Sequence, residues 1–397
     1  MFPKLFDLDT SDVGRSNRAY SDDETLVIQS VLRDAEHLLR EPRRLHELIS
    51  QCKVALAPHR KLPEDVLRCI FALHVQGGMH IPFKRSDIPA AVVLTHVCSL
   101  WRRIALSSPE LWTNISLEMD NCNCSFLPCA LELLSRTRDL PIHLELRVSF
   151  YYHGSDHRDF DFSDAVYQLT SNRNLQKLRL YIDASSPLEF FPKFFPRDTF
   201  SVGTFNRVQD LDLHLYDNAA YPVLSQSSFP NVEAFSYQTT ITGGDLNLPG
   251  MPWNQLRQLD LSKYIQDVPT AVGLLSQCML IEECKLFVVI SGYSINPKVT
   301  LPNLRALEFV FMQIEEEDFD ILDAFFSLLS FPTLQSLVIF EEDSITFSSR
   351  VASPLTRNLK LMAPQLHKVR FNIPIDNGEA CTLLERMPSL QICDAKL

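Results

Sequence analysis

A short apolar pattern that recurs through the C-terminal two thirds of the chain limits the possible folds more than any other feature. Each copy reads apolar-x-x-apolar-x-apolar, and successive copies begin 33, 24, 24, 25, 23, 30, 32 and 24 residues apart. A unit of this length cannot cover its own apolar face, so the copies must stack on one another. The copies are Leu175/Leu178/Leu180, Val208/Leu211/Leu213, Val232/Phe235/Tyr237, Leu256/Leu259/Leu261, Ile281/Cys284/Leu286, Leu304/Leu307/Phe309, Leu334/Leu337/Ile339, Leu366/Val369/Phe371 and Leu390/Cys393/Ala395.

Prolines support the phase of this repeat. Pro230, Pro302, Pro332, Pro364 and Pro388 each lie two residues before the first apolar position of a copy. Proline cannot continue a helix, so each one ends a preceding helical segment and starts a strand. The pattern therefore predicts an irregular solenoid over residues 122–397, in which helices back a curved parallel sheet.

The N-terminal residues predict a disordered tail followed by helices. Residues 1–20 show little apolar periodicity, and residues 21–58 form an amphipathic helical segment. Ser21 and Glu24 have the spacing of a capping box, and Pro42 ends the first helix. We expect this segment to pack against the next domain, because it is too short for a coiled coil.

Residues 62–75 predict a helix with one apolar side. Pro63 stands at a tolerated first position, and Glu64 and Asp65 suit the positive end of the helix dipole. The apolar stripe consists of Val66, Leu67, Ile70 and Phe71.

A second helix is expected over residues 89–106. Its apolar face includes Leu94, Val97, Cys98, Trp101 and Ile104. The segment closes with the sequence SSPELW, which ends at Trp112.

Residues 62–117 closely resemble the F-box. Four features coincide in order: the opening Leu62-Pro63, the apolar stripe of the first helix, Val97-Cys98-x-x-Trp101, and Pro109-x-Leu111-Trp112. Together with the repeats, the chain is most similar to the F-box proteins with divergent leucine-rich repeats that fungi encode in large families. The predicted fold class is therefore a small helical F-box domain over residues 61–117, followed by the α/β solenoid.

The resemblance implies partners and a site. An F-box docks on a Skp-type adaptor, which is itself tethered to a cullin, and its apolar residues divide between a small core and the docking surface. The adaptor-binding residues expected on this basis are Leu62, Pro63, Val66, Leu67, Ile70, Phe71, Leu94, Val97, Cys98, Trp101, Ile104 and Trp112.

Two departures from the family pattern are visible. The segment of residues 76–88 is longer and more polar than usual, and the repeats lack Asn at its usual position. The second departure favours an irregular solenoid without an inner asparagine ladder.

Charge and composition exclude several partners. Of the net charge of −12, about −11 belongs to residues 121–397, which argues against binding to nucleic acid or to an anionic membrane. The most apolar stretch, residues 272–290, contains Glu282, Glu283 and Lys285, too many charges for a membrane span. Ten scattered cysteines and the lack of a signal peptide predict an intracellular protein, cytoplasmic or nuclear.

We expect no catalytic residues, no metal and no cofactor. Cys122, Cys124 and Cys129 lack a second ligand pair at zinc spacing. The acidic loop of residues 153–164 fails as a calcium loop, because Asp164 stands where glycine is required. The chain has no phosphate loop and no nucleophile elbow.

An acidic run supplies a candidate target-binding site. Glu315, Glu316, Glu317 and Asp318 follow the predicted strand of the sixth repeat, and they could select a basic segment of a target protein. The alternative is a solvated helix start that the helix dipole favours.

The resemblance implies a non-catalytic function. We expect a substrate-recognition subunit of a Skp–cullin–F-box (SCF) ubiquitin ligase, which captures an unidentified protein on its repeats. The alternative is a scaffold or localisation module that acts outside a ubiquitin ligase.

Overall fold

The computed structural model divides into two compact units, Met1–Ser116 with Pro128–Pro141, and Leu117–Leu127 with Ile142–Leu397. Residues 128–141, which the repeat pattern assigned to the solenoid, thus belong to the first unit. The structure describes residues 21–37, 46–47, 49–50, 52–53, 62–75, 77–82, 88–120, 126–150, 165, 168–170, 174–184, 205–215, 229–239, 251–290, 298–312, 319–341, 358–359, 362–371, 381, 384–385, 387 and 389–393.

Helix α1 (Asp22–His37) begins at the predicted cap. The Ser21 amide donates to Glu24 Oε2 at 2.8 Å, and the Glu24 amide donates to Ser21 Oγ at 3.2 Å. These two bonds satisfy amides that have no partner within the helix. The capping-box prediction is confirmed.

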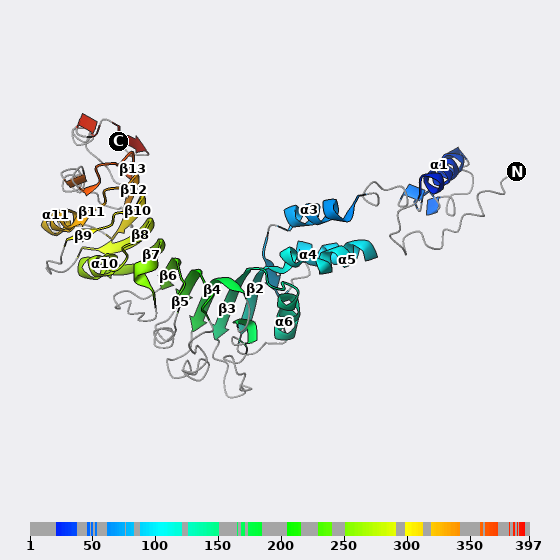
Figure 1. Cartoon of the computed structure of the whole chain (residues 1–397), viewed down its shortest axis with the longest axis horizontal. Helices are drawn as coiled ribbons and strands as arrows, with labels where there is room; N and C mark the ends of the chain where they lie inside the picture. The colour runs from blue at the N-terminus through cyan, green and yellow to red at the C-terminus, as the bar shows by residue number, and fades with distance from the viewer. Residues whose placement is uncertain are drawn as a thin grey trace. The chain divides into compact units, whose positions relative to one another are not determined.

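The first unit is mainly helical. It contains α3 (Glu64–His74), α4 (Ala90–Val97), α5 (Ser99–Ser107), the 3-10 helix η3 (Pro109–Trp112), α6 (Leu127–Ser135) and strand β1 (Met79–Ile81). Helix α3 packs against α4, α5 and η3 (Figure 1). The core of the first unit includes Leu67, Phe71, Ile104 and Trp112, each at most 1% exposed.

The predicted helix over residues 89–106 is instead two helices. Cys98 is extended, with φ −165° and ψ 169°, and separates α4 from α5. In an unbroken helix the Thr95 carbonyl would accept from the Ser99 amide. Here it accepts from Arg102 Nε at 2.7 Å. A side chain therefore replaces the backbone donor at the break.

The residues that follow α5 satisfy its last carbonyls. The Ile104 carbonyl accepts from Ser108 Oγ at 2.8 Å, and the Ala105 carbonyl accepts from Trp112 Nε1 at 3.0 Å. Since the final carbonyls of a helix lack partners within it, these bonds fix η3 against the end of α5.

A sheet of eleven strands dominates the described part of the second unit. Its strands lie in the order β2-β3-β4-β5-β6-β7-β8-β10-β12-β13-β14, and the neighbouring pairs from β3 to β14 are parallel. The strands are β2 (Asn114–Asp120), β3 (Ile142–Phe150), β4 (Leu175–Ala184), β5 (Asp210–Leu215), β6 (Ala234–Thr239), β7 (Gln258–Asp267), β8 (Glu283–Val289), β10 (Ala306–Phe311), β12 (Ser336–Glu341), β13 (Lys368–Phe371) and β14 (Gln391–Cys393).

The strand register reproduces the sequence repeat. The second apolar position of each copy lies beside that of the next, as in Leu178 with Leu211 and Leu307 with Leu337. This row is buried from Leu178 to Val369. In the last copy Ile392, rather than Cys393, lies beside Val369, so the predicted phase of that copy is wrong by one residue.

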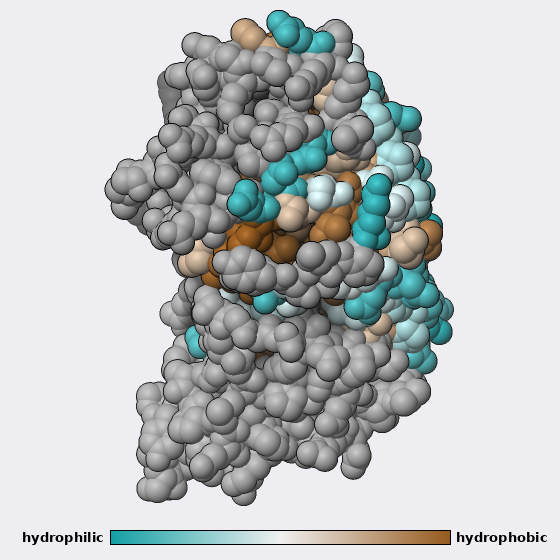
Figure 2. Space-filling view, turned by 90° about the vertical axis from the view of Figure 1, so that its left-hand side faces the viewer, coloured by the Kyte–Doolittle hydropathy of each residue, from teal (hydrophilic) through white to brown (hydrophobic). Residues whose placement is uncertain are grey.

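Helices cover one side of this sheet. Helix α10 (Val268–Leu275) packs on β7 and β8, and α11 (Phe319–Leu328) places Phe325 and Phe326 at ring-centroid distances of 5.6 and 6.2 Å from Phe309. The remaining elements are η5 (Trp253–Gln255) and a small parallel sheet of β9 (Val299–Thr300) with β11 (Leu329–Ser330). Figure 1 shows α10 and α11 on the same side of the large sheet, and Figure 2, viewed from that side, shows a patch of apolar residues with hydrophilic neighbours.

Two strands of the large sheet, β2 and β3, lie outside the predicted repeats. β2 and β3 precede the first copy of the motif, and β3 buries Ile142, Leu144, Leu146 and Val148. The sequence analysis did not predict these two strands, although strict alternation of apolar and polar residues over Ile142–Phe150 is a signal that could have revealed β3. The sheet thus begins before the repeat pattern does.

Candidate functional site

Helix α3 exposes large apolar side chains on one side and buries others on the opposite side. Val66, Ile70 and Leu73 are 39%, 42% and 69% exposed. On the other side of the same helix, Leu67 and Phe71 are fully buried. The apolar stripe of α3 is therefore wider than the face that its own unit covers.

The two following helices also expose apolar side chains. Val93 and Val97 of α4 are 45% and 49% exposed, and Leu106 of α5 is 37% exposed. We call the six side chains the apolar helix surface, which consists of Val66, Ile70, Leu73, Val93, Val97 and Leu106.

Burial separates the twelve predicted adaptor-binding residues into three groups. Pro63, Val66, Ile70 and Val97 are exposed, while Leu62, Cys98 and Trp101 are partly buried. The third group is buried, so these side chains belong to the core of their own unit, which the resemblance also expects for part of the set, and do not lie on its exposed surface. This group consists of Leu67, Phe71, Leu94, Ile104 and Trp112.

Polar contacts hold α3 against α5. Arg68 donates to Ser107 Oγ at 2.8 Å and to Ser108 Oγ at 2.7 Å. Arg103 also forms an ion pair with Glu64. Within the core, the Phe71 and Trp101 rings lie 4.9 Å apart. These contacts fix the face that α3 presents to solvent.

The second unit carries a polar groove on its sheet. The groove has a volume of about 460 Å³ and crosses six neighbouring strands, from β3 to β8. We call it the polar groove. It is lined by His143, Gln176, Lys177, Gln209, Asp210, Glu233, Ala234, Arg257, Gln258, Glu282 and Glu283.

The repeat motif itself places these residues. All of them except His143, which precedes the first copy, occupy the two x positions between the first and second apolar residues of five successive copies, as Glu233 and Ala234 do in the third copy. Parallel pairing then aligns Asp210, Ala234, Gln258 and Glu283 on adjacent strands. Residues far apart in the chain thereby form one continuous row.

A backbone ladder holds this row in place. The amides of Glu233 and Ala234 both donate to the Gln209 carbonyl, at 2.8 and 2.9 Å. The amides of Arg257 and Gln258 donate in the same way to the Glu233 carbonyl, at 2.7 and 3.0 Å. Because each carbonyl accepts two bonds, the main chain under the groove is firmly positioned.

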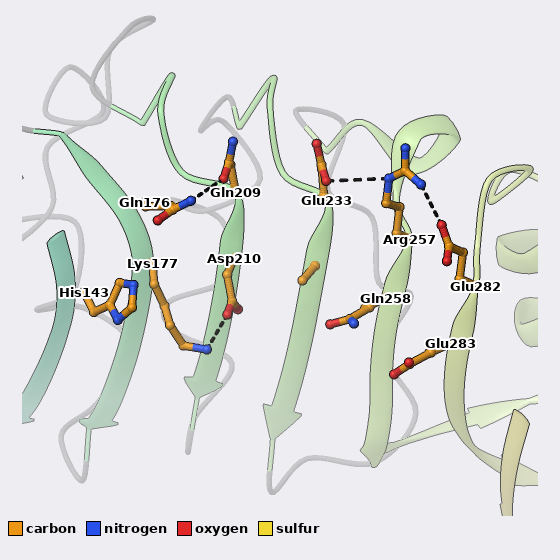
Figure 3. A pocket seen from close by; sticks show the side chains of 11 residues that line it. His143, Gln176, Lys177, Gln209, Asp210, Glu233, Arg257, Gln258, Glu282 and Glu283 are labelled. Atoms are coloured by element: carbon orange, nitrogen blue, oxygen red, sulfur yellow. Dashed lines mark hydrogen bonds and ion pairs between the residues drawn. The ribbon is translucent and has the colours of Figure 1, made fainter. Parts of the chain in front are cut away.

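Ion pairs span the groove from strand to strand (Figure 3). Arg257 lies between two carboxylates, with Nη1 2.6 Å from Glu282 Oε1 and Nε 3.6 Å from Glu233 Oε2. Lys177 pairs with Asp210. Gln176 donates to Gln209 Oε1 at 2.6 Å.

The groove has more negative than positive groups. Four carboxylates line it, those of Asp210, Glu233, Glu282 and Glu283, against the two cations of Lys177 and Arg257. Burial, together with the charge of Lys177, lowers the pKa of His143 although Asp210 opposes this, so the neutral imidazole is favoured. The lining of the groove therefore carries two more carboxylates than cations.

A stacked cluster lies on the same strands, two to four residues further along. The Arg147 guanidinium lies 4.4 Å from the Tyr181 ring centroid, and Tyr181 stacks on His214 at 4.1 Å. Below this stack, Asp212 contacts both Arg179 and His214, at 3.2 and 2.9 Å. Burial alone would raise the pKa of Asp212, but His214, Ser236 and Arg179 together lower it.

Several predicted features fall outside the described residues. These are Glu315, Glu316, Glu317 and Asp318, the cysteines Cys122 and Cys124, and the acidic loop of residues 153–164. The sequence interpretation did not identify the groove residues as a site. Their signal was the run of polar residues at the x positions of five consecutive copies.

Searches for related proteins return no match: no model of a protein family fits this chain, and no curated protein is similar to it. Among the described residues, none of the helices is both long and apolar enough to cross a membrane. Within that same part of the chain, no group of three or more His, Cys, Asp or Glu side chains is arranged to hold a metal ion.

Proposed function

We propose that this chain is the substrate-recognition subunit of an SCF-type ubiquitin ligase. One observation carries the proposal: the first unit exposes the apolar helix surface although the same helices also bury other apolar side chains. Exposed apolar side chains on several helices of one small unit are typical of a protein-binding surface. In the proposed function, a Skp-type adaptor covers this surface.

The resemblance of residues 62–117 to the F-box supports the identity of that partner. Its first helix and its closing Pro109-x-Leu111-Trp112 coincide with α3 and η3. The second unit supports the other half of the proposal, because a parallel sheet built from successive repeats offers a long open face for a target protein. The chain would act by holding its target close to the transferring enzyme, without chemistry of its own.

Charged substitutions on α3 test the docking surface. We expect the double variant Val66→Asp and Ile70→Asp to lose adaptor binding by more than tenfold. Burying each of these side chains is worth about 1.5–3 kcal/mol, and about 1.4 kcal/mol corresponds to a tenfold change in affinity. Binding to a purified Skp-type adaptor, measured by isothermal titration calorimetry, checks this result.

Met279→Asp is the matched control. Met279 is 49% exposed and lies in the second unit, so this variant introduces the same charge at similar exposure and should bind the adaptor normally. Equal binding by the α3 double variant and the wild type would refute the docking surface. Adaptor binding without recruitment of a cullin would favour the scaffold function over the ligase.

A further inference from the structure

We propose that the polar groove binds an extended, basic segment of another polypeptide. This inference rests on the proposed function only in identifying that segment as part of the target. The binding itself depends on the second unit alone.

The length of the groove favours an extended polypeptide. The groove crosses six strands, and neighbouring strands lie about 4.8 Å apart, so it is about 24 Å long. At about 3.3 Å per residue, roughly seven residues of extended chain cover that distance. With a volume of only about 460 Å³, the groove is shallow along this length and does not enclose a compact molecule.

The charge of the groove favours a basic partner. Lys177 and Arg257 are already paired with carboxylates of the groove. Arg257 is shared by Glu233 and Glu282, and Glu282 also lies 3.9 Å from Arg305, which is outside the lining. A partner with Lys or Arg side chains would balance the remaining negative charge, whereas an acidic partner would meet like charges.

Two polar side chains in the groove are open to such a partner. Among the described residues, the side chains of Gln258 and Glu283 have neither a hydrogen-bonding nor an ion-pairing partner, and both are exposed. Figure 3 shows them side by side on β7 and β8. A Lys or Arg side chain of the partner can therefore reach Glu283 without displacing an existing ion pair.

A small residue makes room in the middle of the row. Ala234 lies between Asp210 and Gln258 on the neighbouring strands. The methyl group of Ala234 is shorter than the side chains of Asp210 and Gln258 on the two flanking strands, so it leaves space between them. This gap lets a peptide backbone approach the sheet between the two ends of the groove.

Labelled peptides test the proposal. The first probe is a fluorescein-labelled peptide of alternating Lys and Ala, roughly seven residues long. The second is its counterpart with Glu in place of Lys. Fluorescence anisotropy with the full chain should show binding of the Lys peptide, weaker binding at raised salt because exposed pairs are screened, and no binding of the Glu peptide.

Variants localise the binding. Glu233→Gln and Glu283→Gln should each weaken binding of the Lys peptide about two- to fivefold, the effect of one exposed ion pair. Ala234→Arg should weaken it more, since it fills the gap and adds a positive charge. Glu132→Gln on α6 is the matched control, because Glu132 is a 64% exposed carboxylate of the first unit.

The outcomes are distinct. Lack of discrimination between the two peptides, or an equal loss in the groove variants and in Glu132→Gln, would overturn the proposal. Far-UV circular dichroism confirms that each variant is folded. Adaptor binding is measured separately on the same variants, so failure of the groove and failure of the proposed function are told apart.

Discussion

At the scale of single residues, neighbours of the same chemistry have opposite roles. Ile70 and Phe71 are adjacent and both apolar, yet Ile70 is 42% exposed and Phe71 is fully buried. Successive residues of a helix point about 100° apart, so only one of the two can face α5. Hydrophobicity alone therefore does not separate a buried residue from an exposed one.

The cysteines provide a test at this scale. Burial raises the pKa of Cys278 to about 12 and that of Cys284 well above its ordinary value, with Cys278 and Asp260 adding to the effect on Cys284. Since the thiolate is the reactive form, we expect neither to react with iodoacetamide in the native protein at pH 8.

Cys69 is the internal comparison, because it is exposed on α3 between Val66 and Leu73. We expect it to be labelled, and to be protected once the adaptor is bound. Mass spectrometry of the labelled peptides measures both effects. Rapid labelling of Cys284 in the folded protein would contradict the buried packing of β8.

At the scale of elements, local sequence signals determine where helices begin, whereas packing contacts determine where a helix is interrupted. The capping box of α1 and the start of α3 were predictable, because both depend on residues within one helical turn. The break at Cys98 was not, because it depends on Arg102 reaching back to the Thr95 carbonyl. The helical spacing of apolar residues continues from α4 through Cys98 into α5, so this spacing gave no sign that the helix is interrupted there.

Trp112 tests how η3 is joined to α5. Trp112→Phe keeps an aromatic ring but leaves the Ala105 carbonyl without the indole donor, and it weakens the contact of the Arg136 guanidinium, 5.8 Å above the ring. We expect the free energy of unfolding of the first unit to fall by about 1–3 kcal/mol. Urea denaturation followed by circular dichroism measures this loss.

Trp253→Phe is the control for this change. Trp253 packs edge-on against Phe235 at 5.8 Å, and phenylalanine preserves an aromatic contact there. Its effect should be smaller and confined to the second unit. Equal losses in the two variants would show that the hydrogen bond to Ala105 contributes little.

At the scale of the whole molecule, each unit has its own buried core. The first is built around Leu67 and Phe71, and the second around the rows of apolar residues in the parallel sheet. Repeat units contact their immediate neighbours, so stability in the sheet is the sum of local terms. Because the first and second units have separate cores, we expect them to unfold separately.

The three tryptophans make this prediction measurable, since Trp101 and Trp112 belong to the first unit and Trp253 to the second. Leu67→Ala creates a cavity at a fully buried site, which costs about 2–5 kcal/mol. In a Trp253→Phe background, fluorescence reports on the first unit alone. Leu67→Ala should there move the midpoint of urea unfolding to a lower urea concentration.

With Trp101 and Trp112 replaced by Phe, fluorescence reports on the second unit alone. Leu67→Ala should then leave the unfolding midpoint unchanged. A parallel shift in both backgrounds would mean that the units unfold as one.

The sequence by itself determined the position of most strands, the start of α1 and α3, and the fold class of helices with a large parallel sheet. These follow from periodicity, which states which residues share a face. Tertiary structure decided which faces are covered: it buried Leu94 and Trp112 and left Val66 and Ile70 exposed. Burial depends on contacts between residues distant in the chain, so the repeat pattern predicted which residues lie side by side in the sheet but not which apolar side chains of the helices are covered.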